Sequence, residues 1–255
     1  MPTPTPNWSQ IARSSSALHF HLLGMVDFDS GQRLQEQLLE ELFARDDTKG
    51  YALFCEHPAT VTIGRQGSRA DLLAEPVDFT AREMPTHWLN RPGGTWVHTP
   101  GQLAAYVLLP IDRKGWSLLE YRTRLETALV GLATEFKAPA LSHPESPGLA
   151  GRCGQFAFIG TGCRRGITHQ GMFINVSIPP PALRLVDWGT HDGRVSTLAA
   201  HRRAPTALSS VREAFVRHLA AALDYPRYHL TTGHPSLRRT VRKVYVFTQP
   251  AAHSA

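Results

Sequence analysis

The stretch from residue 156 to residue 178 places the strongest constraint on how this chain can fold. Two strand-like runs, Phe156 to Cys163 and Thr168 to Ile178, are separated only by the turn Arg164-Arg165-Gly166. Two such runs joined by a short turn that contains glycine predict a β-hairpin, in which the strands are antiparallel. We therefore expect a sheet in which at least these two strands are antiparallel neighbours.

The other expected elements mix strands with helices. The clearest helix begins at Ser117, because Glu120 completes a capping box and Leu125, Leu129 and Leu132 recur at helical spacing. Further strands are expected at 18–22, 51–55, 60–63 and 103–109, and further helices near 30–45 and 211–223. This order shows no strict βαβ alternation and no internal repeat. It favours an α+β fold with a mixed β-sheet flanked by helices over a doubly wound sheet.

Composition predicts a folded chain with one main domain. Of the 255 residues, 42% are hydrophobic and 19% are charged, which is typical of globular proteins. We expect the domain to span residues 17–224, preceded by a flexible proline-rich arm over residues 1–16. No acidic residue follows Asp224, so residues 225–255 are expected to form a basic extension. The formal net charge of +6 favours an acidic partner.

Several classes of protein and site are not expected. The longest apolar run, Leu103 to Leu109, is far shorter than the ~20 residues of a membrane-spanning helix, and no secretory signal is recognised. The three cysteines suit reduced thiols in a cytoplasm, and no paired Cys or His spacing predicts a metal site. Nucleic acid is not an expected partner, because no recognition motif or interleaved aromatic pattern is present.

Glycine and polar side chains gather in three stretches at the ends of expected strands. The stretches are Glu56 to Arg65, Arg91 to Leu103, and Ile159 to Gly166 continuing to Asn175-Val176. Glycine permits tight turns and close backbone approach, so loops of this kind commonly line a ligand cleft. On the residues alone, tight turns in a β-rich domain remain the alternative.

The second stretch carries a recognisable motif. It reads Arg-x-Gly-Gly-x5-Pro-Gly-Gln-Leu, with His98 two residues before the second proline. This resembles the signature loop of the octanoyltransferases that make lipoyl proteins, the lipoate–protein ligase B type, although Pro92 is inserted and Thr99 replaces a glycine. The first stretch is similar to that family's Glu-His-x-Pro segment, the third to its Ile-Gly-x3-Arg-Arg strand pair, and Val195 to Leu198 to its Val-Thr-Ser-Leu. The resemblance covers residues 18–223.

The resemblance implies the fold of biotin and lipoate ligases and a cofactor-free acyltransferase of lipoate biosynthesis. An octanoyl group passes from acyl carrier protein to an enzyme cysteine, then to a lysine on a lipoyl domain of a 2-oxoacid dehydrogenase or glycine cleavage protein. A basic surface at the C-terminal segment or at Arg164-Arg165 suits the acidic carrier. The implied substrate-binding residues are Arg65, Arg91, Gly93, Gly94, His98, Gly101, Gln102 and Gly160. For the two arginines and for His57 and His98, a role in bracing the loops is the open alternative.

The chain departs from the family at both catalytic positions. Gln155 stands where the family's catalytic lysine begins a Lys-Ile-x-x-Ile-Gly strand. Trp188 or its neighbour stands where the family has the cysteine of Pro-Cys-Gly, and no cysteine follows Cys163. A neutral amide cannot lower the pKa of a thiol by charge, and an indole cannot form a thioester. The family mechanism therefore cannot operate as written, and Trp188 is expected to be a hydrophobic plug or a stacking platform.

Two replacements for the missing chemistry are open. Cys153 lies two positions before Gln155 and would share its face on a regular strand, so it is the candidate for a relocated nucleophile. Alternatively, an acceptor lysine attacks a bound thioester directly, with His98 or His169 as general base. The other thiols, Cys55 and Cys163, are expected to be inert. The surviving hypotheses are a transferase without the usual pair and a catalytically silent relative that binds an acyl carrier or lipoyl domain. An ATP-dependent lipoate or biotin ligase is a third, weaker hypothesis.

Overall fold

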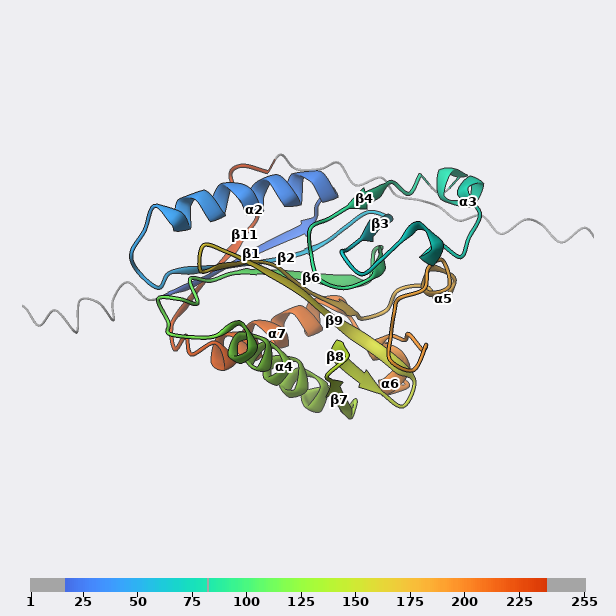
Figure 1. Cartoon of the computed structure of the whole chain (residues 1–255). Coiled ribbons are helices and arrows are strands. Elements are labelled where there is room, and N and C mark those ends of the chain that lie inside the picture. The colour runs from blue at the N-terminus through green and yellow to red at the C-terminus, as the bar shows by residue number, and fades with distance from the viewer. Residues whose placement is uncertain (1–16, 82, 238–255) are drawn as a thin grey trace, which may run out of the picture.

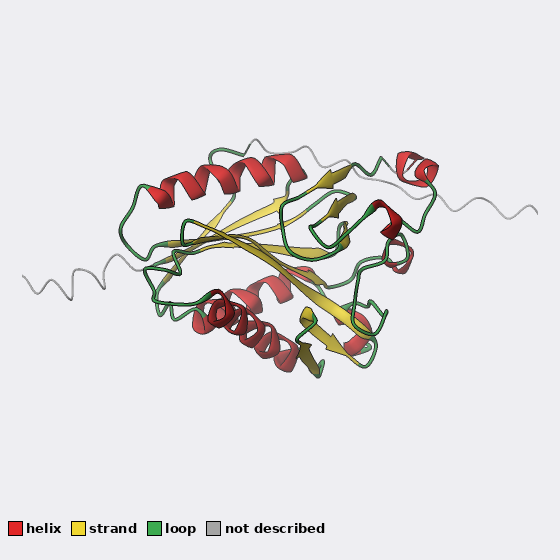
Figure 2. Ribbon diagram, viewed as in Figure 1, coloured by secondary structure: helices red, strands yellow, loops and turns green. Residues whose placement is uncertain are grey.

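A large twisted sheet lies between two helical layers (Figure 1; Figure 2). The computed structural model describes residues 17–81 and 83–237. In spatial order the strands of the large sheet are β11 (Tyr228–Thr232), β1 (Leu18–Met25), β2 (Gly50–Glu56), β6 (Gln102–Leu108), β10 (Ile167–Asn175), β9 (Gly154–Arg164), β8 (Ser146–Gly151) and β7 (Ala140–His143). Strands β11, β1 and β2 pair in parallel, and all later neighbours pair antiparallel. The expected mixed sheet is confirmed.

Both faces of the central strands β2, β6 and β10 are buried, and each face belongs to a separate hydrophobic core. Alternate residues of β6 show the division: Leu103 and Val107 join the core under α4 (Leu118–Glu135) and α7 (Leu208–Ala222). Ala104 and Leu108 join the core on the opposite face. Side chains alternate in this way because successive residues of a strand point to opposite faces. Helix α2 (Phe28–Phe43) covers that opposite face (Figure 1).

A small second sheet lies on the same side as α2 and carries parts of the first two glycine-rich stretches (Figure 1). Its strands, in spatial order, are β4 (Thr86–Trp88), β3 (Thr60–Ile63) and β5 (Thr95–His98). The remaining elements are η1 (Arg69–Asp71), α3 (Pro76–Ala81), α5 (Pro180–Leu183) and α6 (Leu198–Arg202). Strand β5 leads through a short turn into β6, so the second glycine-rich stretch joins the two sheets. Within the described residues, no helix combines the length and apolarity needed to cross a bilayer.

The expected hairpin is confirmed with different strand bounds: β9 covers Gly154–Arg164 rather than 156–163, and β10 begins at Ile167 rather than Thr168. Strands β9 and β10 pair from Arg164 to Ile167, and Arg165 and Gly166 both have positive φ (50° and 78°). A two-residue turn with both φ values positive matches the right-handed twist of the strands. The second strand ends at Asn175 rather than Ile178, because the next two amides donate to the Gly101 carbonyl oxygen outside the ladder.

The folded part of the chain extends past the domain end expected at residue 224. Strand β11 pairs in parallel with β1, with Leu18 opposite Tyr228, and so forms one edge of the large sheet. The first part of the expected basic extension is therefore a strand of the domain. The expected arm at residues 1–16 and the basic residues of 238–255 lie outside the described residues.

Candidate functional site

Arg91 lies entirely inside the protein and braces the glycine-rich loop. Its guanidinium group lies 3.6 Å from the centre of the Trp96 ring and donates to the carbonyl and hydroxyl oxygens of Thr62, at 3.1 and 2.7 Å. Burial lowers the pKa of Arg91 to about 9. Of the two roles open for this residue, these contacts support bracing of the loop against β3.

Arg65 has the opposite environment. Its side chain is exposed and donates one hydrogen bond to Asn90 Oδ1 at 3.3 Å. The backbone amide of Arg65 donates to the Arg91 carbonyl oxygen at 2.9 Å, so the two arginines sit on adjoining loops. Arg65 is therefore the arginine of this pair that a charged partner can reach.

His98 belongs to a buried hydrogen-bonded chain of polar side chains. Its Nδ1 donates to Gln102 Oε1 at 2.7 Å, and the Thr62 hydroxyl donates to its Nε2 at 2.8 Å. Gln102 Nε2 in turn donates to Asn175 Oδ1 at 2.8 Å. Burial holds the pKa of His98 well below 6.5, so the ring is neutral. Because both ring nitrogens are engaged, His98 as it stands serves to position these strands and offers no free nitrogen as a base.

His57, from the first stretch, is also buried and engaged. Its Nδ1 donates to the Val26 carbonyl oxygen at 2.7 Å, and the Tyr106 hydroxyl lies 2.7 Å from its Nε2. Burial lowers the pKa of His57 to about 4. The neighbouring Cys55 thiol is buried too, and burial raises its pKa, which fits the inert thiol expected there. His57 thus ties β2 to β6 and to the start of α2.

Gln155 is the second residue of β9, and both ends of its side-chain amide are hydrogen-bonded. The Ser146 hydroxyl donates to its Oε1 at 2.5 Å, and its Nε2 donates to the Ala157 carbonyl oxygen at 3.0 Å. Its backbone carbonyl oxygen accepts from the Ser196 amide at 2.8 Å, and Asn175 Nδ2 donates to the Ser196 carbonyl oxygen at 3.3 Å. Gln155 is therefore connected through Ser196 and Asn175 to the chain that contains His98.

Trp188 is buried, with 4% of its surface exposed. Its indole Nε1 donates to the Leu183 carbonyl oxygen at 2.9 Å, and its ring lies 5.0 Å from that of Phe158. These contacts correspond to a hydrophobic plug rather than to a stacking platform open to solvent. Trp188 ties its loop to α5 and to β9.

The glycines bring the three stretches into contact. A Cβ atom on Gly160 would lie 2.6 Å from the Trp96 ring and 3.1 Å from the Pro92 carbonyl oxygen, so only glycine lets β9 approach this loop. A Cβ atom on Gly94 would lie 3.7 Å from the Trp188 carbonyl oxygen. Gly93 and Gly101 have φ of 93°, a value that favours glycine. The Arg91 loop therefore contacts β9 at Gly160 and the Trp188 loop at Gly94.

Cys153 does not satisfy the geometry that made it a candidate nucleophile. Strand β9 begins at Gly154, and Cys153 lies in the turn before it, so the two-residue face rule does not apply. Its half-exposed thiol lies 4.0 Å from the Ala200 carbonyl oxygen, on α6. Cys163 is an exposed residue near the far end of β9. Partial burial of its thiol group raises the pKa of that thiol.

His169, the other candidate base, lies at a distance from Gln155 along the sheet. It is half-buried on β10 and pairs with Gly162, seven residues after Gln155 on β9. Burial lowers its pKa, so the imidazole is neutral near pH 7. Neither expected base therefore meets both conditions. His98 has no free ring nitrogen, and His169 lies away from Gln155 along the sheet.

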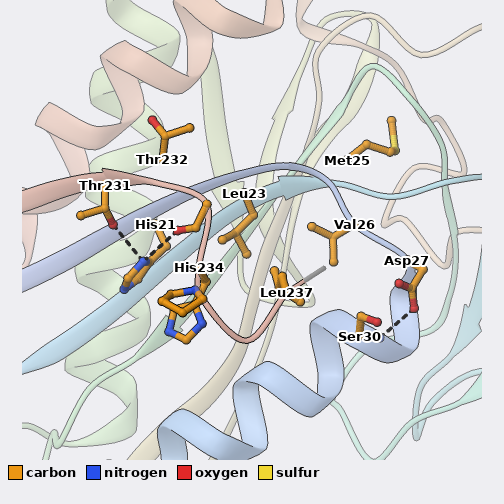
Figure 3. Close-up of a pocket in the computed structure, with 12 residues that line it drawn as sticks. His21, Leu23, Met25, Val26, Asp27, Ser30, Thr231, Thr232, His234 and Leu237 are labelled. Atoms are coloured by element: carbon orange, nitrogen blue, oxygen red, sulfur yellow. Dashed lines mark hydrogen bonds between the residues drawn. The ribbon is translucent and has the colours of Figure 1, made fainter. Parts of the chain in front are cut away.

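A cavity of about 430 Å³ opens at the β11 edge of the large sheet (Figure 3). Its wall is built from β1, β11 and the start of α2, and it includes His21, His234 and Asp27. His21 Nδ1 lies 2.9 Å from Thr231 Oγ1 in this wall. None of the implied substrate-binding residues lines this cavity, although Val26 in its wall accepts the hydrogen bond from His57 of the first stretch.

The sequence assigned no role to Thr62 or Ser146, although both hold site residues in place. Thr62 connects Arg91 with His98, and Ser146 holds Gln155. The available signal was weak: Thr62 is a polar residue in a strand whose four residues are all buried. Buried polar side chains nearly always have a hydrogen-bond partner, so such a residue predicts a network but not its members.

Comparisons of the sequence and of the structure with known proteins agree with the fold and with the order of the motifs along the chain. Residues 28–220 match the model of the lipoyl protein ligase A/B catalytic domain. The Geobacter metallireducens octanoyltransferase is 30% identical over 84% of this chain and 97% of its own length, and that of Pseudomonas putida strain GB-1 is 28% identical over 86% and 98%. Among solved structures, a bipartite lipoate protein ligase from Thermoplasma acidophilum has a TM-score of 0.68 at 13% identity, covering 87% of this chain and 89% of that one. The chain therefore belongs to the lipoyl protein ligase A/B catalytic-domain family and, within it, to the octanoyltransferases.

Proposed function

We propose that the protein transfers an octanoyl group from acyl carrier protein to a lipoyl-domain lysine in one step, without an acyl-enzyme intermediate. The observation that carries this proposal is the burial and hydrogen bonding of Trp188 and Gln155, the residues at the positions of the family's cysteine and lysine. Neither residue can act as a nucleophile or supply a charge. Octanoyltransferase relatives that match over 84% and 86% of the chain support the reaction class.

Direct transfer needs no protein side chain that forms a covalent bond with the octanoyl group. The neutral amine of the acceptor lysine attacks the thioester carbonyl carbon, so a C–N bond forms and the C–S bond breaks. The leaving thiolate of the carrier takes up the proton that the amine loses. Holding the two reactants in contact can itself supply a large part of the rate. The protein's contribution is therefore the rigid loop arrangement that Arg91, His98 and Gln102 maintain.

The partners in this proposal are acyl carrier protein and a lipoyl domain. The net charge of +6 favours an acidic partner, and Arg65 is exposed beside the motif loop. At the hairpin turn the Arg164 guanidinium is already paired with Glu36 at 2.8 Å, and that of Arg165 lies 4.4 Å from the Phe43 ring. Arg65 is therefore a better candidate for docking than the Arg164-Arg165 turn.

The second hypothesis, a silent relative that binds one of these partners, has its own support. Both nitrogens of His98 are engaged, so the buried network holds no free base. A protein of this kind would bind octanoyl-acyl carrier protein or the lipoyl domain and release it unchanged. The two hypotheses differ in one product, the octanoylated lipoyl domain.

Incubation with octanoyl-acyl carrier protein and an apo lipoyl domain distinguishes them. We expect intact-mass spectrometry to show octanoylation of the lipoyl domain, more slowly than the ~1–10³ per second of ordinary enzymes, and no adduct on the protein. Cys153→Ser should transfer at the native rate. If the lipoyl domain is octanoylated no faster than in a control reaction without the protein, the protein is the silent relative. An adduct that disappears in Cys153→Ser would instead establish a relocated nucleophile.

A further inference from the structure

Two histidines and one glutamate lie close together outside the three glycine-rich stretches. His143 ends β7, Glu145 lies in the turn that follows, and His191 lies in the loop after Trp188. One ligand atom from each of the three lies within 4.8 Å of the others, and this is the only such group of His, Cys, Asp or Glu among the described residues. We propose that these three side chains bind one zinc-class divalent cation. The proposal is independent of the transfer reaction.

The donor set suits such an ion. Imidazole nitrogens and a carboxylate oxygen are ligands that Zn²⁺ and its neighbours in the transition series prefer, and three protein ligands leave a position for water. In a tetrahedral site with bonds of about 2.0–2.1 Å, ligand atoms lie roughly 3.4 Å apart. Glu145 Oε2 already lies 3.2 Å from His191 Nδ1. The remaining contraction requires side-chain rotation, for which the exposed Glu145 and His191 have room.

The two imidazole rings are held face to face. The ring centres of His143 and His191 lie 3.6 Å apart with an angle of 20° between the planes. The nitrogen lone pairs lie in the ring planes, so binding of one cation by both rings would require one ring to turn out of this stack. The close approach of the two rings keeps both imidazoles within reach of a single ion.

Contacts outside the cluster fix both segments in place. Arg122 on α4 donates to the carbonyl oxygens of His143 and Pro144, at 3.3 and 3.4 Å, and its own charge is paired with Glu126. In the other segment, the Arg194 amide donates to Asp192 Oδ1 at 3.1 Å. Preorganised ligands lose less conformational entropy on binding, which favours metal affinity. The charged side chains nearest to the cluster in sequence, Asp192 and Arg194, neutralise each other.

A bound ion would connect the supports of the two altered catalytic positions. Glu145 directly precedes Ser146, which holds Gln155, and His191 follows Trp188 by three residues. The cation would thus join the β7–β8 turn to the loop of Trp188. Sequence spacing could not indicate this site, because His143 and His191 are 48 residues apart and form no paired motif.

Metal titration of the full, tag-free chain tests the proposal. We expect one equivalent of Zn²⁺ in calorimetry, and a Co²⁺ complex with visible absorption from nitrogen and oxygen ligands. His191→Ala and His143→Ala should each weaken binding at least tenfold, and Glu145→Gln should weaken it less. Excess Zn²⁺ should raise the Tm of the native protein by about 5 °C and leave that of His191→Ala unchanged.

His218→Ala is the matched control, because His218 pairs with Glu135 at 2.8 Å but has no second histidine in its group. This variant should bind like the native protein. Two results would overturn the proposal: no stoichiometric binding by the native chain, or equal affinity in His191→Ala. Loss of binding in His234→Ala but not in His191→Ala would also overturn it, by placing the ion beside β1 and β11.

Discussion

Replacing Trp188 by Cys and Gln155 by Lys together should make the protein form a stable octanoyl thioester with itself. The two substitutions restore the family's residue types at the two positions that the resemblance assigns to catalysis. A lysine at position 155 would place its ammonium where Nε2 now donates to the Ala157 carbonyl oxygen. A nearby cation favours the thiolate, which is the reactive form of cysteine. After incubation with octanoyl-acyl carrier protein, we expect the adduct to rise from undetectable to the major species in the intact-mass spectrum.

The single variants and a folding check make this result interpretable. Trp188→Cys alone should react far more slowly, since a poorly solvated thiol without a cation keeps a high pKa. Gln155→Lys alone should form no adduct. Loss of the buried indole costs about 3–5 kcal/mol, so a cooperative thermal transition must first be shown for each variant. A folded double variant that stays unmodified would show that the two positions do not face one reactive centre.

Arg91→Ala should lower the free energy of unfolding by about 3 kcal/mol. The substitution removes the stacking on Trp96 and leaves the Thr62 carbonyl oxygen, inside the protein, without its donor. Relief of the desolvation of a buried cation offsets part of the loss. Urea denaturation measures the effect, and the exposed Arg65→Ala is the matched control, expected within about 0.5 kcal/mol of the native protein.

Arg91→Lys separates charge from geometry in the same measurement. Lysine retains the positive charge but lacks the planar group that stacks on Trp96 and bonds Thr62 twice. We therefore expect it to recover less than half of the loss in Arg91→Ala. Full recovery in Arg91→Lys, or native stability in Arg91→Ala, would contradict the bracing role.

The sequence predicted the sheet class and the hairpin because those depend on local patterns. The turn at Arg165 and Gly166 is an example, since neighbouring residues decide it. The pairing of β11 with β1 could not be predicted in this way. It joins Leu18 to Tyr228 across more than 200 residues, and no local periodicity specifies such a partner.

The burial of the predicted site residues could not be predicted from the sequence. The resemblance implied His98 and Gln102 as substrate-binding residues, and the structure shows both buried in a hydrogen-bonded network. A sequence shows which residues are polar, but burial depends on packing that the whole fold determines. Cys153 illustrates the same limit, because the face rule requires knowing that β9 begins one residue later.

Initial-rate kinetics with both substrates tests the central claim most directly. If the octanoyl group passes straight from carrier to lysine, both must be bound together. Plots of reciprocal rate against reciprocal lipoyl-domain concentration, at several concentrations of octanoyl-acyl carrier protein, should then intersect. Parallel lines would reveal the ping-pong kinetics of an acyl-enzyme intermediate and would contradict direct transfer.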